Sequence, residues 1–143
     1  MLKPNSWIAC GAMLAGLAVV SGAFGAHGLK DFLKESRNLT DESVKRPLEI
    51  YETAVRYQMY HALALVLVGV TAVQRRSPWL NAAGWGFVAG MAVFSGCLYA
   101  MVFGAPAWLG AVVPLGGLAL VVAWFVFAVA ASTAGSGKGR SAP

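Results

Sequence analysis

Four long apolar segments, separated by shorter polar ones, dominate the chain at about residues 7–27, 57–74, 79–103 and 106–131. A hydrocarbon core about 30 Å thick is crossed by roughly 20 apolar residues in a helix, so each segment can span a membrane. A spanning sheet would need alternating segments of roughly ten residues closed into a barrel, and this pattern shows none. The pattern predicts an all-α membrane protein, with four transmembrane helices in an antiparallel bundle forming one domain over residues 1–131.

The only strongly polar segment lies between the first two spans, at residues 30–56. At its start, Leu29, Phe32 and Leu33 stand among charged residues, which predicts a short amphipathic surface segment. Thr40, followed by two acids, is typical of a helix N-terminus, and Pro47 suits a first helical turn. We therefore expect the second helix to begin outside the bilayer.

The later joints between spans are short and contain helix-ending and helix-starting residues. Ser77 is a candidate N-cap with Pro78 as the first helical residue, and Gly104 and Pro106 separate the third span from the fourth. Neighbouring spans should therefore be antiparallel. Pro114, inside the fourth span, is expected to kink that helix or bring it close to a partner.

The two ends of the chain carry further expectations. Residues 1–25 have some features of a signal peptide, but the apolar run is longer than a signal peptide needs, so we interpret it as an uncleaved first span. Residues 132–143 are rich in Gly and Ser and are expected to form a disordered tail.

Small residues recur at helical spacing within the spans. In the first span they are Gly11, Ala15, Ala18, Gly22 and Ala26, with Ala12, Gly16 and Ala23 beside them. Such stripes allow helix backbones to approach closely, although glycine is also simply common in membrane helices. The residues predicted to pack helices together are Gly22, Gly25, Ala82, Gly86, Gly90, Gly96, Pro114, Gly116 and Gly117.

Composition and charge support a membrane protein. Of the 143 residues, 58% are hydrophobic and 12% are charged, against about 25% charged in soluble domains. The net charge of +5 comes from bases that flank the spans, so we expect contact with lipid head groups and no nucleic acid as a partner. The bases are nearly balanced between the two sides, and the acids interleaved at residues 30–56 favour both termini in the cytoplasm.

Both histidines of the chain lie near the predicted membrane boundary. The first span ends at His27, and the apolar run of the second begins just after Tyr60, so an antiparallel pair would place His27 and His61 at one membrane face. We predict that the two rings meet in a polar cluster. Its members would be His27, His61, Tyr57, Gln58, Arg56 and Glu52.

Three roles remain open for this pair. The rings could satisfy backbone carbonyls or each other and so fix the packing of two helices. They could instead form a proton-sensitive or ligand-binding pocket, because imidazole titrates near neutral pH. A metal site is disfavoured, since two imidazoles leave a tetrahedral ion short of ligands unless a partner supplies more.

Several blocks of sequence resemble one family. They are residues 22–29 (GAFGAHGL), Thr53-Ala54 with residues 57–63 (YQMYHAL), Phe94-Ser95-Gly96 with Tyr99, and residues 114–117 (PLGG). These resemble the YgdD-like family of small four-span membrane proteins, whose animal relatives are called transmembrane protein 256. The resemblance implies a four-helix fold in the bacterial cytoplasmic membrane and carries no activity. Cys97, where serine is usual, and Val113, where threonine is expected, depart from its pattern.

No catalytic set is visible in the sequence. The spans contain no Ser-His-Asp combination, no HExxH motif and no paired carboxylates, so we expect no enzyme, no catalytic residues, no cofactor and no metal. The absence of Asp, Glu, Lys, Arg and His from residues 77–137 also disfavours a proton-coupled transporter. The favoured function is a non-catalytic accessory, assembly or lipid-organising subunit that packs with itself or another membrane protein. The alternative is a protein that binds or conducts a small ligand, metal or proton at the His27/His61 end.

Overall fold

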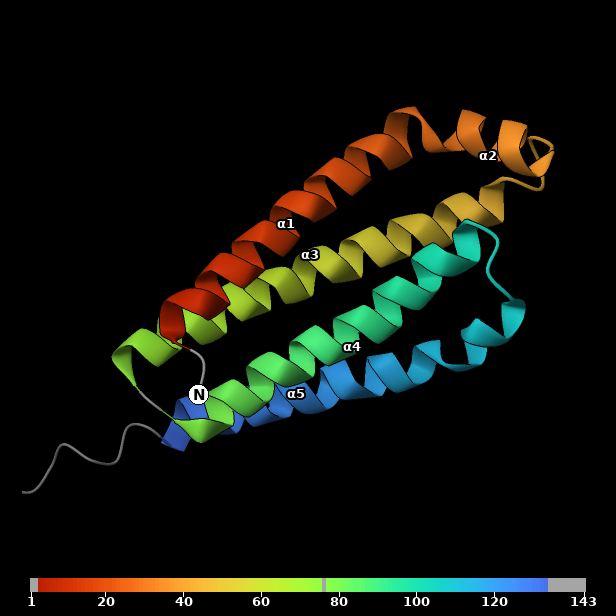
Figure 1. Cartoon of the computed structure of the whole chain (residues 1–143). Coiled ribbons are helices and arrows are strands. Elements are labelled where there is room, and N and C mark those ends of the chain that lie inside the picture. The colour runs from red at the N-terminus through yellow and green to blue at the C-terminus, as the bar shows by residue number, and fades with distance from the viewer. Residues whose placement is uncertain (1–2, 76, 134–143) are drawn as a thin grey trace, which may run out of the picture.

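The structure is a computed structural model and describes residues 3–75 and 77–133. Within these ranges it contains helices and no strand (Figure 1). Four helical segments are long and apolar enough to cross a membrane, which confirms the predicted fold class. The elements are α1 (Pro4–His27), α2 (Leu29–Arg37), α3 (Lys45–Gln74), α4 (Pro78–Val102), the 3₁₀ helix η1 (Ala107–Ala111) and α5 (Val113–Thr133).

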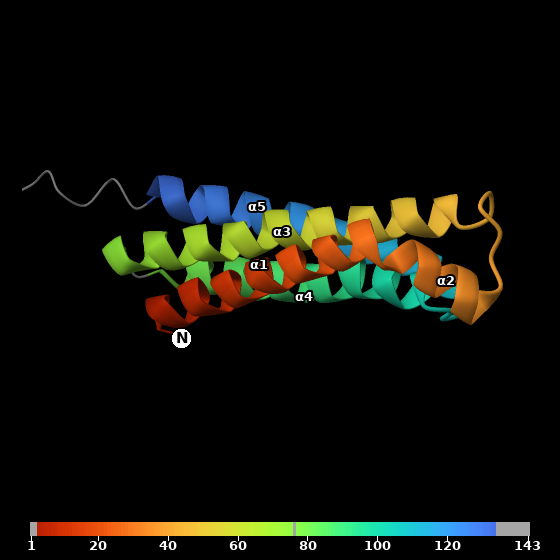
Figure 2. The same cartoon turned by 90° about the horizontal axis from the view of Figure 1, so that it is seen from above.

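The four long helices pack mainly in the order α1, α3, α4, α5. The extensive contacts join α1 to α3, α3 to α4 and α4 to α5, so α1 and α5 are the two outer helices. Figures 1 and 2 show their axes roughly aligned, with α2 at the end of the bundle where α1 turns back toward α3. α1 and α5 therefore each keep a broad face free of intramolecular contacts.

Helices α1 and α3 approach each other at glycines. A Cβ atom added at Gly11 would lie 2.6 Å from the carbonyl oxygen of Ala62, and one added at Gly69 would lie 2.8 Å from the backbone nitrogen of Ile8. The predicted packing residues Gly22 and Gly25 also face α3, where added Cβ atoms would lie 3.5 Å from Val55 and 2.9 Å from the Tyr51 ring. At Gly11 and Gly69 the neighbours include backbone atoms, so only a hydrogen side chain fits there, whereas Gly22 makes an ordinary contact.

Helices α4 and α5 share a second close contact. Added Cβ atoms at Gly86 and Gly90 would lie 2.9 Å from the Cβ of Ala123 and 2.7 Å from the Leu120 side chain. From the other side, a Cβ on Gly116 would lie 2.5 Å from the backbone nitrogen of Phe94. Three of the predicted packing positions, Gly86, Gly90 and Gly116, therefore lie at this close α4–α5 contact.

Four other predicted packing positions differ. Ala82 and Gly96 are exposed, and an added Cβ at Gly96 would have no neighbour within 4 Å, so these two do not pack helices together within the described bundle. Gly117 makes only ordinary contact with the Phe94 ring, at 3.6 Å. Pro114 is the exposed second residue of α5, after η1, so it starts a helix where a kink was predicted. The physical reason is that Val112, the C-cap residue of η1, separates η1 from α5, so Pro114 falls in the first turn of α5, where its missing N–H breaks no intrahelical hydrogen bond.

The helix boundaries follow the predicted signals in most places. α3 begins at Lys45, well before its apolar run, as expected for a helix that starts outside the bilayer. Ser77 caps α4 by accepting a hydrogen bond from the Trp79 backbone at 3.2 Å, with Pro78 as the first helical residue. The predicted tail lies outside the described residues from residue 134 onward, while residues 132 and 133 complete α5.

Candidate functional site

The two histidines do not meet, so the predicted His27/His61 site is wrong. Gly11 lies against Ala62, which places His61 level with the early part of α1. His27 lies 16 residues further along α1 (27 − 11), about 24 Å away at 1.5 Å per residue. The prediction failed because α3 starts twelve residues before its apolar run (57 − 45), so the end of α1 pairs with Tyr51.

The His61 ring is held in an aromatic layer on the side of α3 that faces α4 and α5. Its Nδ1 lies 2.7 Å from the Tyr57 carbonyl oxygen, and its ring is 5.9 Å from those of Tyr57 and Phe87 and 6.3 Å from that of Trp124. His61 is buried, whereas His27 is exposed at the end of α1. The stripe of Tyr57 and His61 therefore faces away from α1, and it fixes the packing of α3 against α4 and α5.

Gln58 is the polar residue that joins three helices. Its amide nitrogen donates to the Leu14 carbonyl oxygen of α1 at 3.0 Å, and its amide oxygen accepts from the Tyr99 hydroxyl of α4 at 2.9 Å. Tyr51 extends this contact, because its ring lies 5.2 Å from that of Tyr99 and its hydroxyl donates to the Ser21 carbonyl oxygen at 3.1 Å. The sequence named Gln58 as a cluster member but not these partners.

A groove runs between α1 and α4, with α3 as its floor. Its volume is about 320 Å³, and it is open on its outer side. Ser95 lies in it and is only 2% exposed, yet its hydroxyl has no hydrogen-bond partner among the described residues. An unpaired buried hydroxyl costs about 1–3 kcal/mol, so this one calls for an explanation. The lining includes Leu14, Leu17, Gln58, Ser95, Gly96 and Tyr99.

Trp7 joins α1 to α4 toward the other end of the bundle. Its indole nitrogen donates to the Asn81 side-chain oxygen at 3.1 Å, and a Cβ added at Gly84 would lie 2.8 Å from its ring. The Trp7 side chain is buried. The groove is thus bounded by one fixed α1–α4 contact at Trp7 and by the Gln58–Tyr99 bridge further along.

The remaining cluster members, Glu52 and Arg56, form an ion pair on the exposed side of α3. Neither reaches the groove or His61 in the described contacts. Exposed pairs one helical turn apart contribute only about 0.3–0.5 kcal/mol. Within the described residues, no group of three His, Cys, Asp or Glu side chains lies close enough to hold a metal ion.

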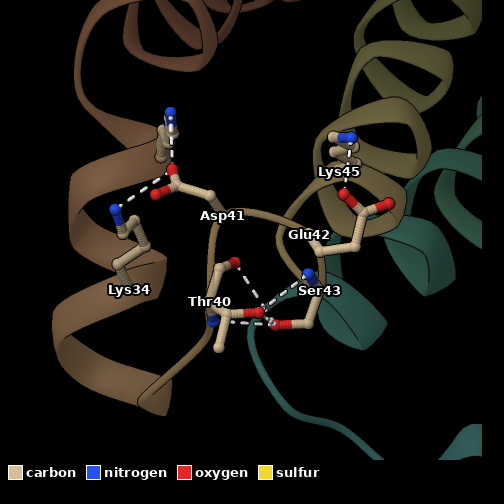
Figure 3. A network of polar contacts seen from close by, with 7 residues as sticks. Lys34, Thr40, Asp41, Glu42, Ser43 and Lys45 are labelled. Carbon is tan, nitrogen blue, oxygen red and sulfur yellow. Dashed lines mark hydrogen bonds and ion pairs between the residues drawn. The ribbon is translucent and has the colours of Figure 1, made fainter.

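The polar end of the bundle is organised by short ion pairs (Figure 3). Asp41 accepts from Lys30 at 2.9 Å and from Lys34 at 3.1 Å, which ties α2 to the turn that follows it. Thr40 and Ser43 cap this turn reciprocally, the Thr40 hydroxyl accepting from the Ser43 backbone at 3.2 Å. Thr40 was predicted to start a helix, but it starts the turn that precedes α3, which begins at Lys45.

Arg37 connects α2 to α4 in a way the sequence did not reveal. Its guanidinium donates to the Val102 carbonyl oxygen, at the last residue of α4, at 2.8 Å. The last carbonyls of a helix lack intrahelical donors and carry partial negative charge, so a cation stabilises this end. The side chains of Leu29 and Leu33, both on α2, are buried while its charged residues are outward, which confirms its amphipathic character.

The lysine pair around Asp41 leads to a pH prediction. Hydrogen bonding by Lys30 and Lys34 lowers the pKa of Asp41 below its usual value, and the same contact raises the pKa of Lys30. Because the Asp41 pKa is depressed on folding, its contribution to stability is present above the usual carboxyl pKa and is lost as pH falls through the lowered value. A carbon NMR titration in micelles should show this lowered pKa. Lys30→Gln with Lys34→Gln should raise it, while the control Lys45→Gln should not; an Asp41 pKa unaffected by the double change would contradict the assignment.

The comparisons with known proteins agree with this architecture. A family model described as "Protein of unknown function (DUF423)" matches residues 21–117, which include Gln58, Ser95 and Tyr99. A UPF0382 membrane protein of Staphylococcus epidermidis is 38% identical over 124 residues, covering 87% of this chain and 93% of its own length. The UPF0382 membrane protein YwdK of Bacillus subtilis is 39% identical over 126 residues, covering 87% and 94%.

No solved structure matches the chain. The bacterial relatives are themselves named membrane proteins and align over nearly their whole length, in agreement with the four long apolar helices. The family resemblance noted in the sequence is thereby confirmed. The chain is a multi-pass membrane protein and belongs to the DUF423 family, together with the UPF0382 membrane proteins.

Proposed function

We propose that this protein is a non-catalytic accessory subunit of the bacterial cytoplasmic membrane, which associates with membrane helices of a second copy or of another protein through the outer face of α1. The carrying observation is a row of small residues on the outer face of α1, which lies among exposed large side chains such as Met13 and Leu17. The exposed face of α1 includes the small residues Ala9, Ala12, Gly16 and Ala23, and an added Cβ at Gly16 would have no neighbour within 4 Å.

The exposed face of α5 is built differently. It carries large apolar side chains, including Leu115, Leu118, Val121 and Phe125, which are 51–69% exposed. Bulky side chains suit contact with lipid tails, whereas small ones permit close approach of another helix, where van der Waals contact is the main attraction. The exposed residues of α5 from Leu115 to Phe125 are all large, whereas exposed small residues interrupt the large ones on α1, and this supports α1 as the side that meets protein.

The polar residues also support a role without chemistry. His61 bonds to a backbone carbonyl inside an aromatic layer, and His27 lies about 24 Å along the helix from it. The ion pairs of the polar end are exposed and local. Each of these groups supports packing of the bundle, and none is arranged beside a nucleophile.

We further propose that both termini lie in the cytoplasm. A four-span chain has both ends on one side of the membrane, and the segment on the other side contains all six acids of the chain among its bases. Its lysines are used in ion pairs with Asp41 and Glu42. Counted by Lys and Arg alone, the two sides are nearly equal, with five bases on the terminal side and six on the other, so the proposal rests on the acids that accompany the six.

Photo-crosslinking in native membranes tests the association. A photoreactive amino acid would replace Met13 on α1 or Leu118 on α5, two outward positions of similar exposure at 70% and 62%. We expect the Met13 probe to crosslink to protein and the matched Leu118 probe to crosslink to lipid alone. Lipid adducts alone from both positions would contradict the proposed function.

A further inference from the structure

Two residues that line the groove between α1 and α4 carry hydrogen-bond donors that the fold does not use. The Ser95 hydroxyl has no partner among the described residues, although serines inside helices often bond to the carbonyl four residues earlier. The Gln58 amide nitrogen carries two hydrogens, and its one described bond goes to Leu14. Both residues line the groove, but the Ser95 oxygen is buried beneath its surface, so the side chain must rotate about its Cα–Cβ bond for an acceptor in the groove to bond to it.

The depth of these donors restricts what can supply that acceptor. Leu14, the partner of Gln58, lies ten residues after Pro4 and thirteen before His27, about 15 Å and 20 Å from the two ends of α1. This is near the middle of a hydrocarbon core about 30 Å thick. The ester carbonyls of membrane lipids are held at the interface by their polar head groups, so they do not reach this level.

The groove has the size and lining of a small-molecule site. Its volume of about 320 Å³ lies within the usual range of ligand pockets, which are mostly apolar with a few placed polar groups. Leu14 and Leu17 form one apolar wall, and Gly96 leaves the opposite rim open. Ser95, Gln58 and Tyr99 supply the polar groups.

From this juxtaposition we propose that the α1–α4 groove binds a membrane-soluble carbonyl compound of the quinone type, with a carbonyl oxygen accepting from Ser95 and Gln58. A quinone ring on an apolar tail carries its acceptor within the hydrocarbon, at the depth of these donors. The inference concerns binding alone and includes no electron transfer. It is independent of the association proposed for α1, whose face of small residues lies beside the groove.

The test uses the full chain in nanodiscs of saturated phosphatidylcholine. The probes are a benzoquinone with a decyl chain, a diacylglycerol and decane, the last of which lacks a carbonyl. We expect the quinone to bind and raise the melting temperature, and its infrared carbonyl band to move to lower frequency as hydrogen bonds form. Ser95→Ala should weaken quinone binding roughly fivefold to tenfold, the equivalent of one hydrogen bond, and remove most of the band shift.

The variants separate a binding role from a structural one. Because the Ser95 hydroxyl is unpaired in the fold, Ser95→Ala should leave the melting temperature without ligand unchanged or raise it. The control Ser132→Ala removes a hydroxyl that bonds to Val129 on α5 and should not alter binding. Gly96→Leu should fill the groove and abolish binding with the fold intact, since its added Cβ meets nothing within 4 Å.

Four results would overturn the proposal. They are equal quinone binding by wild type and Ser95→Ala, a lower melting temperature of Ser95→Ala without ligand, binding of the diacylglycerol but not the quinone, and no quinone binding by wild type. In the last case, a change of oligomeric state in Gly96→Leu would assign the groove to a second copy of the chain. The Met13 crosslinking result is unaffected by any of these outcomes, so failure of one proposal is distinguishable from failure of the other.

Discussion

Replacing Gly11 by alanine is expected to lower the free energy of unfolding by about 1–3 kcal/mol, the usual cost of overpacking a tight contact. The new methyl group would lie 2.6 Å from the Ala62 carbonyl oxygen and 2.8 Å from the Val66 backbone nitrogen. These are backbone atoms and cannot rotate away, so α1 must move off α3. Unfolding followed by circular dichroism in detergent would measure the loss, and leucine at the same site should cost more.

Gly16→Ala is the matched control on the same helix. An added methyl group there meets nothing within 4 Å, and alanine favours helix more than glycine does. Its stability should therefore equal or slightly exceed that of wild type. Equal effects of Gly11→Ala and Gly16→Ala would show that α1 does not pack on α3 through Gly11.

Gly116→Ala is expected to produce the second large loss, at the α4–α5 contact. Its methyl group would lie 2.5 Å from the Phe94 backbone nitrogen and 2.9 Å from the Phe94 Cα. We expect a loss of about 1–3 kcal/mol for the same reason as at Gly11. The same unfolding measurement applies, with α5 separating from α4.

The neighbouring Gly117 provides the comparison for this site. A methyl group there would make an ordinary contact at 3.6 Å with the Phe94 ring, so Gly117→Ala should leave stability within about 0.5 kcal/mol of wild type. A larger loss for Gly117→Ala than for Gly116→Ala would reverse the orientation of α5 against α4.

The helices of this protein could be predicted from its sequence because membrane spans depend mainly on length and apolarity. The hydrophobic pattern indicated four spans, and local residues such as Ser77 and Pro78 marked a helix start correctly. Local capping and propensity are short-range effects, so they are visible without knowledge of the neighbours. The amphipathic segment at Leu29 and Leu33 was visible for the same reason.

The register between helices could not be predicted in the same way. His27 and His61 both lie at the edges of apolar runs. The register of α1 against α3 is set instead by the close contacts that Gly11, Gly25 and Gly69 make with the facing helix. Hydropathy marks how deep a residue lies and does not fix which residue of a neighbouring helix it touches. The α3 helix continues through the polar segment, which shifted the expected pairing.

The groove was missed because its donors are inconspicuous in the sequence. Ser95 and Tyr99 entered only as part of a family resemblance, and a single serine in an apolar helix usually bonds to its own backbone. Its importance follows from burial without a partner, which only the packed structure reveals. The sequence pattern also placed Gln58 in a cluster with His27 and His61, whereas its hydrogen-bond partners are Leu14 and Tyr99.

Native mass spectrometry of the protein released from nanodiscs, for wild type and Gly16→Leu, tests the central claim most directly. The account predicts that wild type carries a second copy or another membrane protein, and that Gly16→Leu is released alone with an unchanged melting temperature, since an added Cβ at Gly16 has no neighbour within the fold. Wild type released only as a monomer, or a complex that Gly16→Leu leaves intact, would contradict association through α1.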